Sequence, residues 1–499
     1  MNLATALLQS AAAHPERPAI LWGTEQWTHR RLTEEAAALA EHLQTQLGVA
    51  PGDRVAIWLK NRPEFIIALF GVLFARAAVV PINNFLKPPE VAYMLRDAGV
   101  RVLITDASMN EGLPQLESSQ PGLKVLLAED FAGLKAKSSG RIPAVGSTES
   151  DLAVIIYTSG TTGKPKGAML SHGNLLSNVE SCRQRLQATE SDRFIVLLPL
   201  FHSFMLCVGT MLPLLSGGSM LLVKSLHPVK NVLAEIIEHG GTVLPAIPQF
   251  FRALAAMPDL PALPLRLCIS GAAPLPREIL KEFHDRVRVP LREGYGLSEA
   301  SPVVSNNPID DTWKVGSIGL PLPGVEVLIK DDQGQTLPTG EQGELWVRGG
   351  NVMLGYWNQP EETAKSLRDG WLLTGDIGYQ DADGFLFITD RKKDMLLVNG
   401  INVYPREIEE VLYQFPGIKE AAVIGIPDAR KGEQPLAFLA ADAGTTIDEK
   451  AVLQFLRSRL ADYKVPRRVH LLAALPRNAT GKILKTELRQ LAVEPQRES

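Results

Sequence analysis

The chain has 499 residues, of which 45% are apolar and 21% charged, and its formal net charge is −4. This length is too great for one hydrophobic core, so we expect about two to four domains or subdomains. The weakly negative charge gives no argument for nucleic acid as a partner. The three cysteines lack metal-type spacing, and their small, odd number favours a reducing compartment over a disulfide scaffold.

Residues 1–5 lack the basic and apolar segments of an export signal, so we expect a cytoplasmic protein. The longest apolar runs, 66–82 and 205–223, are interrupted, the first by Arg76 and the second by Pro213. Neither supplies the ~20 uninterrupted apolar residues that a membrane span needs. We interpret both runs as buried core. Peripheral membrane association is compatible with this pattern, as are a monomer and a homodimer.

Residues 1 to about 150 alternate between helical and strand patterns. Such repetition predicts a largely parallel sheet covered by helices. No residue of this segment carries chemistry by itself. The expected helices cover residues 27–43, 63–75 and 91–97, and the expected strands cover 54–59, 78–82 and 100–105.

An apolar strand at 152–156 leads into the sequence Tyr-Thr-Ser-Gly-Thr-Thr-Gly-Lys-Pro-Lys-Gly at 157–167. Its glycines let backbone N–H groups face a ligand, its hydroxyls can donate to phosphate oxygens, and its lysines can neutralise phosphate charge. Only two residues separate Gly160 from Gly163, so the loop is not a Walker P-loop. It predicts a polyphosphate site, and a mobile surface loop is the alternative. The expected phosphate-binding residues are Thr158, Ser159, Gly160, Thr161, Thr162, Gly163, Lys164 and Lys166.

Two segments after the phosphate loop each contain a histidine. Ser171 is expected to cap a helix, with His172 in a structural role. His202 stands between Pro-Leu-Phe and the apolar run from Phe204 to Val208. That run has no charged side chain, which suits a hydrocarbon chain better than an amino acid, although core packing would give the same pattern.

Two later motifs have the composition of a nucleotide site. Gly-Ala-Ala-Pro-Leu at 271–275 offers small side chains against which a flat base could lie, or simply a tight turn. Glu-Gly-Tyr-Gly-Leu-Ser-Glu follows at 293–299. In it Tyr295 can stack on a purine, Ser298 can bond a phosphate, and Glu299 can hold Mg²⁺.

The pattern changes after residue 324. Short alternating strands at 325–347 predict a small β subdomain. Five consecutive charged residues at 390–394 then separate a body from about one hundred C-terminal residues, which is long enough for an independent α+β domain. We therefore expect domains at 1–390 and 391–499. Within the second, helices are expected at 407–413 and 449–460 and strands at 421–425 and 436–440.

Taken together, these motifs resemble the signatures of the adenylate-forming superfamily, which comprises acyl-CoA synthetases, carrier-loading adenylation domains and luciferases. The resemblance covers nearly the whole chain and is strongest to bacterial fatty-acid–CoA ligases. It implies an α/β fold: a large N-terminal domain of αβ-layered sheets with a small β subdomain, and a small mobile α+β C-terminal domain hinged at about Lys393. The family usually has glycine where Arg76 stands and threonine where Ser298 stands. The matching motifs lie at 157–167, 199–202, 271–275, 293–299, 374–376, 390–394 and 476–482.

The resemblance also implies roles for individual residues. The expected catalytic residues are Lys482, Thr162, Glu299 and His202, with Glu299 as the Mg²⁺ ligand. The expected substrate-binding residues are His202, Phe204, Val208, Pro302 and Val303. Beyond the phosphate loop, the residues expected to bind ATP or CoA are Gly271, Ala272, Ala273, Glu293, Gly294, Tyr295, Gly296, Ser298, Asp376, Arg391, Lys393, Gly400 and Lys482.

The implied activity is ATP-dependent: a medium- to long-chain carboxylate becomes an acyl-AMP with release of pyrophosphate, and the acyl group then passes to CoA. Rotation of the tail about Lys393 would withdraw Lys482 and present Gly400. No insertion separates Gly355-Tyr356-Trp357 from Thr374-Gly375-Asp376, which favours CoA over a carrier protein. An aryl- or coumarate-type ligase and a carrier-loading acyl-AMP ligase stay open. A non-catalytic binding relative and a kinase-like transferase are disfavoured.

Overall fold

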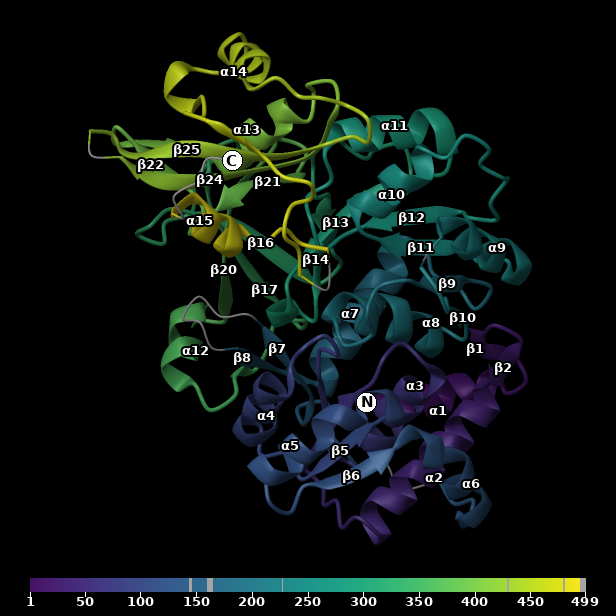
Figure 1. The fold of residues 1–499 in the computed structure, drawn as a ribbon. Coiled ribbons are helices and arrows are strands. Elements are labelled where there is room, and N and C mark those ends of the chain that lie inside the picture. Colours follow the sequence, from purple (N-terminus) through teal and green to yellow (C-terminus); the bar gives the residue numbers. More distant parts are fainter. Residues whose placement is uncertain (143–145, 159–164, 227, 429, 479–480, 494–499) are drawn as a thin grey trace.

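The computed structural model describes residues 1–142, 146–158, 165–226, 228–428, 430–478 and 481–493. Figure 1 shows a large α/β body, from the N-terminus at the bottom to the teal elements at the right, and a smaller C-terminal lobe above it. The predicted fold class, a large α/β domain followed by a small α+β domain, is confirmed. No helix in these ranges is long and apolar enough to cross a bilayer.

Two large sheets form the body. The seven-stranded sheet runs in the order β18 (Gly355–Tyr356), β8 (Lys166–Ser171), β7 (Leu152–Thr158), β4 (Ala78–Pro81), β3 (Arg54–Trp58), β5 (Val102–Thr105) and β6 (Lys124–Leu127). The nine-stranded sheet runs in the order β15 (Leu320–Pro321), β14 (Val303–Asn306), β13 (Leu291–Gly296), β12 (Leu267–Ser270), β11 (Val243–Ala246), β9 (Arg193–Val196), β10 (Ser219–Leu222), β1 (Pro18–Trp22) and β2 (Glu25–Thr28).

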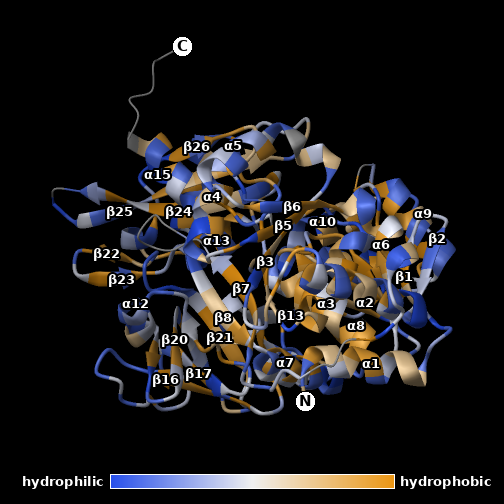
Figure 2. Ribbon diagram, turned by 90° about the horizontal axis from the view of Figure 1, so that it is seen from below, coloured by the Kyte–Doolittle hydropathy of each residue, from blue (hydrophilic) through white to orange (hydrophobic). Residues whose placement is uncertain are grey.

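Helices of the body cover these sheets, as the alternating pattern predicted. Helix α3 is apolar on all sides, and every residue from Phe65 to Phe74 is buried. Such a helix is stable only inside a core. Figure 2 shows the contrast, with hydrophobic residues concentrated in inner elements such as β7 and α8. The body helices are α1 (Leu3–Ala13), α2 (His29–Thr45), α3 (Pro63–Phe74), α4 (Pro88–Asp97), α5 (Leu113–Ser119), α6 (Phe131–Lys137), α7 (His172–Leu186), α8 (Leu212–Leu215), α9 (Val229–His239), α10 (Pro248–Ala255) and α11 (Arg277–Val287).

Two smaller sheets complete the chain. The β subdomain pairs β16 (Val325–Lys330), β17 (Gly343–Gly349), β20 (Trp371–Gln380), β19 (Leu367–Arg368) and β21 (Leu386–Arg391), with α12 (Pro360–Ser366) beside it. The small lobe pairs β23 (Ile401–Val403), β22 (Leu396–Val398), β25 (Gly432–Ala441), β24 (Ile418–Asp428) and β26 (Val469–Leu471), and carries α13 (Pro405–Leu412), α14 (Glu449–Arg457) and α15 (Lys485–Val493).

Arg76 ends α3 in the conformation that glycine would adopt. Its φ is +62°, in the left-handed region that a Cβ disfavours. The turn is held by two backbone hydrogen bonds: Arg76 N–H donates to Leu73 O at 3.1 Å, and Gly52 N–H donates to Arg76 O at 2.8 Å. Arg76 therefore ends α3 in the left-handed conformation that glycine adopts more easily, and this conformation has an energetic cost for arginine.

Helix α7 leads from the phosphate-loop hairpin into the body. Ser171 caps it as predicted, since its hydroxyl accepts from Asn174 N–H at 3.0 Å. His172 is buried, and its Nδ1 accepts from Leu3 N–H at 3.2 Å, which confirms a structural role. Burial lowers the pKa of His172 to about 4.

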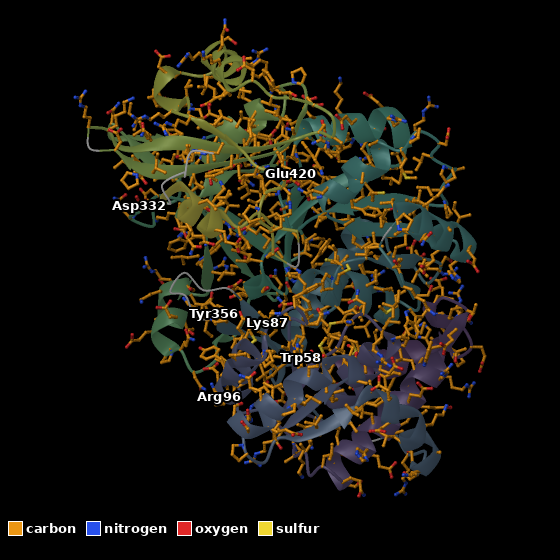
Figure 3. All side chains as sticks on the ribbon, viewed as in Figure 1. Trp58, Lys87, Arg96, Asp332, Tyr356 and Glu420 are labelled. Atoms are coloured by element: carbon orange, nitrogen blue, oxygen red, sulfur yellow. The ribbon has the colours of Figure 1, made fainter. Side chains whose placement is uncertain are left out.

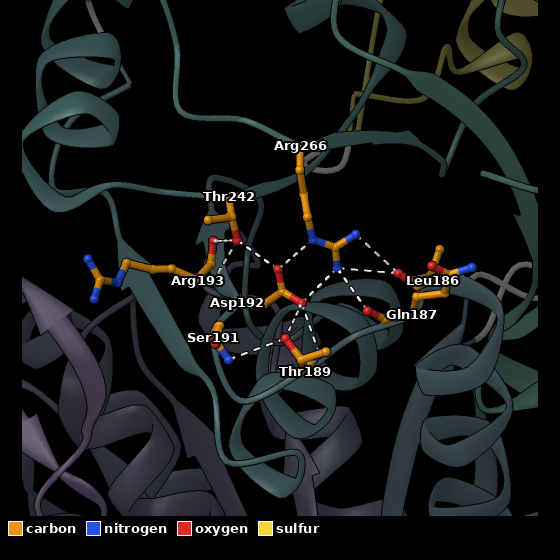
Figure 4. Close-up of polar contacts among 8 residues, drawn as sticks. All are labelled: Leu186, Gln187, Thr189, Ser191, Asp192, Arg193, Thr242 and Arg266. Atoms are coloured by element: carbon orange, nitrogen blue, oxygen red, sulfur yellow. Dashed lines mark hydrogen bonds and ion pairs between the residues drawn. The ribbon is translucent and has the colours of Figure 1, made fainter. Parts of the chain in front are cut away.

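The far end of α7 is held by an ion-pair network (Figure 4). The carboxylate of Asp192 is buried and accepts two hydrogen bonds of 2.6 Å from Arg266. The same guanidinium donates to the carbonyl oxygens of Leu186 and Gln187 at 3.3 Å. Arg266 therefore neutralises the buried carboxylate and satisfies the last carbonyls of α7, which fixes where that helix ends.

Candidate active site

A cavity of about 1230 Å³ lies where the body, the β subdomain and the small lobe meet. It gathers side chains that are far apart in the sequence, including Glu299 of the body, Asp376 of β20 and Lys482 of the small lobe. The predicted site residues that line it are Thr158, Lys166, His202, Phe204, Val208, Gly271, Ala272, Gly294, Tyr295, Gly296, Ser298, Glu299, Pro302, Val303, Asp376, Arg391, Lys393 and Lys482.

Asp376 anchors one end of the cavity. It lies opposite Arg391 in the antiparallel β20–β21 pair, and Arg391 Nε is 3.0 Å from Asp376 Oδ1. The hydroxyl of Tyr295 donates to Asp376 Oδ2. This ion pair raises the pKa of Arg391. A carboxylate has about four lone-pair sites, so Asp376 can still accept from two further hydroxyls.

The glycine and alanine motifs bring backbone close to this end. Gly271 lies against the ring of Phe204, where a Cβ would stand 3.1 Å from Phe204 Cζ. At Gly296 a Cβ would stand 2.2 Å from the carbonyl oxygen of Pro302, so only glycine fits. Ala272 has φ +64°, which turns the chain sharply at the end of β12. Non-glycine residues in this conformation cluster at ligand sites.

Glu299 lies between the body and the β18 strand. Its Oε1 accepts from the hydroxyl of Tyr356 at 2.9 Å and is 3.5 Å from Thr158 Oγ1. Tyr356, labelled in Figure 3, is on β18 near α12. The carboxylate is therefore fixed at the start of the phosphate-loop segment.

Lys166 follows that segment. Its ammonium group pairs with the carboxylate of Glu362 on α12 and lies 5.4 Å from the centroid of the Tyr356 ring. The pairing lowers the pKa of Glu362 to about 2. The predicted phosphate-binding residues Ser159, Gly160, Thr161, Thr162, Gly163 and Lys164 lie outside the described residues.

His202 stands at the junction between the polar and apolar parts of the cavity. Its Nδ1 accepts from the backbone N–H of Phe204 at 3.3 Å, which leaves the proton of a neutral ring on Nε2. Burial, with the charge of Lys482 as a smaller cause, lowers its pKa to about 4. His202 is therefore a neutral hydrogen-bond donor at pH 7. Nearby, the hydroxyls of Ser203 and Ser298 are 3.0 Å apart.

Lys482 reaches the cavity from a turn of the small lobe. Arg477 of that turn pairs with Glu420 (labelled in Figure 3) at 3.1 Å. Gly481 has φ +82°, and a Cβ there would stand 2.4 Å from Ile247 Cδ1 of the body, so the turn packs directly on the body. Burial, with the charge of Arg391 as the next cause, lowers the pKa of Lys482 to about 8.

The structure does not place three predicted site residues on the cavity wall: Ala273, Glu293 and Gly400. The carboxylate of Glu293 accepts from Leu275 N–H at 3.0 Å and lies 3.9 Å from Arg406 of the small lobe. Burial raises its pKa to about 7. Gly400 is exposed at the tip of the β22–β23 hairpin, with φ +77°. In this arrangement of the lobes, Glu293 is buried outside the cavity lining and Gly400 is exposed outside it.

Apolar side chains line the part of the cavity next to His202. We define this apolar wall as Cys182, Leu186, Phe204, Val208, Ile269, Pro302, Val303 and Leu322. All its members except Pro302 belong to one hydrophobic cluster of the body. Val208 lies in a π-helix, Met205–Met211, a local widening that is frequent at functional sites.

Comparison with known proteins decides which family this arrangement represents. The sequence model of the AMP-binding enzyme family matches residues 7–357, and that of the AMP-binding enzyme C-terminal domain matches residues 407–482. The chain belongs to the AMP-binding enzyme family. It is therefore an adenylate-forming acid–thiol ligase of the acyl-CoA synthetase type that uses ATP, as its motifs predicted.

Relatives within the AMP-binding enzyme family span nearly the whole chain. A long-chain-fatty-acid–CoA ligase of Bacillus subtilis is 37% identical over 99% of this chain and 95% of its own length. A feruloyl-CoA synthase of an Amycolatopsis species is also 37% identical, with 97% of each chain covered. ATP-bound MatB of Rhodopseudomonas palustris is 34% identical and has a TM-score of 0.92 over 98% of this chain and 99% of its own. Apo MatB from the same organism has a TM-score of 0.82 over the same shares of the two chains, so this structure resembles the ATP-bound form more closely.

Several residues of this AMP-binding enzyme site were missed by sequence reasoning. Tyr356 entered only as a landmark before the hinge, and its bond to Glu299 depends on the β18–β8 pairing. Cys182 and Leu186 look like ordinary core positions of α7, and Asn306 looks like a residue of a strand end. Their place at the cavity follows from sheet register and helix position, which the local pattern does not specify.

Proposed function

We propose that this AMP-binding enzyme is a fatty-acid–CoA ligase that activates a medium- to long-chain carboxylate. The observation that carries the proposal is the continuity of one cavity from a charged end, with Asp376, Arg391 and Lys482, to the apolar wall. The apolar wall has no charged side chain, which suits a hydrocarbon chain. The identity with the B. subtilis ligase supports the same reading.

In the first half-reaction, a carboxylate oxygen attacks the α-phosphorus of ATP and pyrophosphate leaves. The main obstacle is repulsion between two anions, so catalysis is mostly positioning and charge neutralisation. In the proposed complex, Nε2–H of His202 orients the carboxylate, Asp376 accepts from the ribose hydroxyls, and Lys482 offsets charge at the α-phosphate.

Mg²⁺ is expected to accompany ATP, held by Glu299. No group of three or more His, Cys, Asp or Glu side chains is placed for a metal within the described part of the chain. Mg²⁺ commonly takes one or two carboxylates and completes its shell with phosphate oxygens and water. The single carboxylate of Glu299 therefore fits an ion that arrives with a triphosphate, where it would supply positive charge.

In the second half-reaction, a thiol attacks the carbonyl carbon of the acyl-AMP and AMP leaves. Lys482 would then obstruct the approach. We propose that the small lobe rotates about Lys393, near the boundary of the 1–390 and 391–499 units, which withdraws Lys482 and brings the Gly400 hairpin to the cavity. The exposed position of Gly400 supports this order of events.

An aryl-CoA ligase is the second candidate. The Amycolatopsis feruloyl-CoA synthase is as similar in identity as the fatty-acid ligase. The ring of Phe204 lines the cavity and offers a surface on which a flat aromatic acid could stack. A carrier protein in place of CoA is a third reading, which the absence of an insertion before the hinge disfavours.

A panel of acids tests the proposal: acetate, octanoate, dodecanoate, palmitate, benzoate and cinnamate, with release of AMP and pyrophosphate measured with and without CoA. The proposal predicts the highest kcat/KM for an aliphatic acid of eight or more carbons and acyl-CoA as product. Higher values for cinnamate or benzoate would favour the aryl ligase. Release of ADP would contradict both.

A further inference from the structure

Two side chains that line the cavity, those of Asn306 and Ser270, each have a buried polar atom without a hydrogen-bond partner in the described ranges. Asn306 of β14 lines the cavity and is only 3% exposed. Its Oδ1 has no hydrogen-bond partner in the described ranges. A buried polar atom without a hydrogen-bond partner destabilises the fold, so the unpaired Oδ1 of Asn306 calls for a ligand or another explanation.

The sheet register places this amide on the same face of the sheet as Phe204. Asn306 pairs with Gly294 across β13 and β14, and its Nδ2 lies 2.6 Å from where a Cβ of residue 294 would stand. On the other side of β13, Ser270 pairs with Glu293, so Gly271 and Gly294 are the next neighbours in that register. The ring of Phe204 lies over Gly271. Aligned residues on neighbouring strands share a face, so the amide and the ring lie on the same face of the sheet.

The surroundings of Asn306 belong to the hydrocarbon part of the site. Phe204 is a member of the apolar wall, and so is Leu322, whose N–H donates to the carbonyl oxygen of Val304, two residues before Asn306 on β14. A plain alkyl chain in this place would leave the amide unpaired. It would also displace any water that could serve the amide.

Two other asparagines nearby show what a structural amide looks like in this protein. Asn178 donates to the carbonyl of Val303 at 2.7 Å and accepts from its N–H at 3.1 Å. Asn307 donates to Ser317 O at 2.6 Å and accepts from Lys314 N–H at 3.1 Å. Both clamp backbone groups. Asn351 also has an Oδ1 without a partner in the described ranges, but its Nδ2 clamps the carbonyls of Ala300 and Val303. What sets Asn306 apart is that its side chain lines the cavity.

We propose that Asn306 is a specificity-determining residue that hydrogen-bonds a hydroxyl group on the hydrocarbon part of the acid. The preferred substrates are then hydroxylated carboxylic acids. The inference rests on the proposed CoA-ligase function and refines its substrate class. A hydroxyl both donates and accepts, so it matches the amide in either orientation. A site of this kind rejects the analogue that lacks the hydroxyl because its own polar group is left unpaired.

The experiment compares matched acids: decanoate with 3-hydroxydecanoate and 10-hydroxydecanoate, and cinnamate with 4-hydroxycinnamate. kcat/KM for pyrophosphate release is measured for the wild type and for Asn306→Leu, which keeps the branching of the side chain and removes the amide. At least one hydroxylated acid should exceed its parent by about tenfold or more in the wild type. In Asn306→Leu that ratio should fall about tenfold or more, through the hydroxylated acid, while KM for ATP stays within about twofold.

Ser305→Ala is the matched control. Ser305 is the adjacent residue of β14, and its hydroxyl faces the other way and donates to Ile318 O at 2.8 Å. This variant should keep the wild-type ratio. Asn306→Thr, which supplies a hydroxyl in place of the amide, should keep part of the discrimination that Asn306→Leu loses and so separates recognition from packing.

The results distinguish a failure of this inference from a failure of the proposed function. The aliphatic and aromatic pairs tell which kind of hydroxyl is recognised. Activity on the parent acids with no preference for any hydroxylated partner, or a preference that Asn306→Leu leaves unchanged, would overturn the inference alone. Absence of pyrophosphate release with every acid would overturn the proposed function and this inference with it.

Discussion

The guanidinium of Arg252, in the body, lies 3.0 and 3.1 Å from the two carboxylate oxygens of Asp442, in the small lobe. It also donates to the carbonyl oxygen of Ile418 at 3.3 Å and to that of Lys419. Helix α10 thereby holds the edge of the small lobe's sheet. Because the same lobe carries Lys482, this contact favours the arrangement in which the lysine faces the cavity.

Arg252→Ala should therefore slow acyl-AMP formation more than thioester formation. The pair is partly exposed, so we expect a modest fall of about threefold to tenfold in the first half-reaction. Transfer of a supplied acyl-AMP to CoA should be unchanged or faster, because the lobe is released more easily. Each half-reaction is measured separately by rapid quench. Arg348→Ala, which breaks an exposed pair with Glu326 inside the β subdomain, should change neither rate.

The two half-reactions should also respond differently to pH. Burial beside Arg391 lowers the pKa of Lys482 to about 8, so its positive charge is present below that pH and lost above it. kcat/KM for acyl-AMP formation should fall by about tenfold per unit above pH 8. In Lys482→Arg, whose side chain stays charged, this fall should disappear. A fall of the same steepness in Lys482→Arg would assign the titration to another group.

Arg266 should contribute to stability through Asp192. Arg266→Met leaves a buried carboxylate without its cation, and we expect the free energy of unfolding to fall by about 2–4 kcal/mol. Burial by itself raises the pKa of Asp192, but the hydrogen bonds from Arg266, Thr189 and Thr242 and the charge of Arg266 together lower it. Stability from the pair is therefore present above the unfolded-state pKa and lost as pH falls.

Urea unfolding measures this difference. The gap in the free energy of unfolding between wild type and Arg266→Met should be full at pH 7 and should narrow as the pH falls below about 4, the ordinary pKa of aspartate, toward the lowered pKa of Asp192. Arg183→Met, which removes an exposed pair with Glu180, should change stability by no more than about 0.5 kcal/mol. A gap that widens on acidification would contradict the assignment.

Arg76→Gly should raise stability. The left-handed conformation costs a residue with a Cβ about 1–2 kcal/mol, of which the greater freedom of glycine in the unfolded chain offsets part. A net gain of about 0.5–1 kcal/mol in thermal or urea unfolding is expected. Arg76→Ala keeps the Cβ and should give no gain. Equal gains for both variants would place the effect in the arginine side chain.

Local signals in the sequence were enough for several elements. The apolar run of α3 and the cap at Ser171 were both predicted, because each depends on residues within a few positions. The expected helix at 27–43 begins two residues too early. Residues 25–28 form β2 against β1, and Thr28 caps the helix that follows. A strand partner decided that boundary, and helical periodicity cannot reveal a partner.

At the cavity, too, some residues could be predicted from the sequence and others could not. Asp376, Arg391 and Lys482 belong to motifs, so resemblance found them, and the structure brings them to one place. Arg252 and Asp442 are 190 residues apart and lie outside every motif. Asn306 gains its significance only from the register that sets it over Gly294. Relations of this kind depend on packing between distant segments, which composition and spacing do not encode.

The central claim is that Lys482 serves the first half-reaction and leaves the site for the second. Lys482→Ala tests it directly, with Lys464→Ala, a partly buried pair partner of Glu407 in the same lobe, as the control. We predict that Lys482→Ala slows acyl-AMP formation by about a hundredfold to a thousandfold, the effect of removing one preorganised donor. Conversion of supplied acyl-AMP and CoA to thioester should proceed at the wild-type rate. Equal loss of both half-reactions would contradict the account.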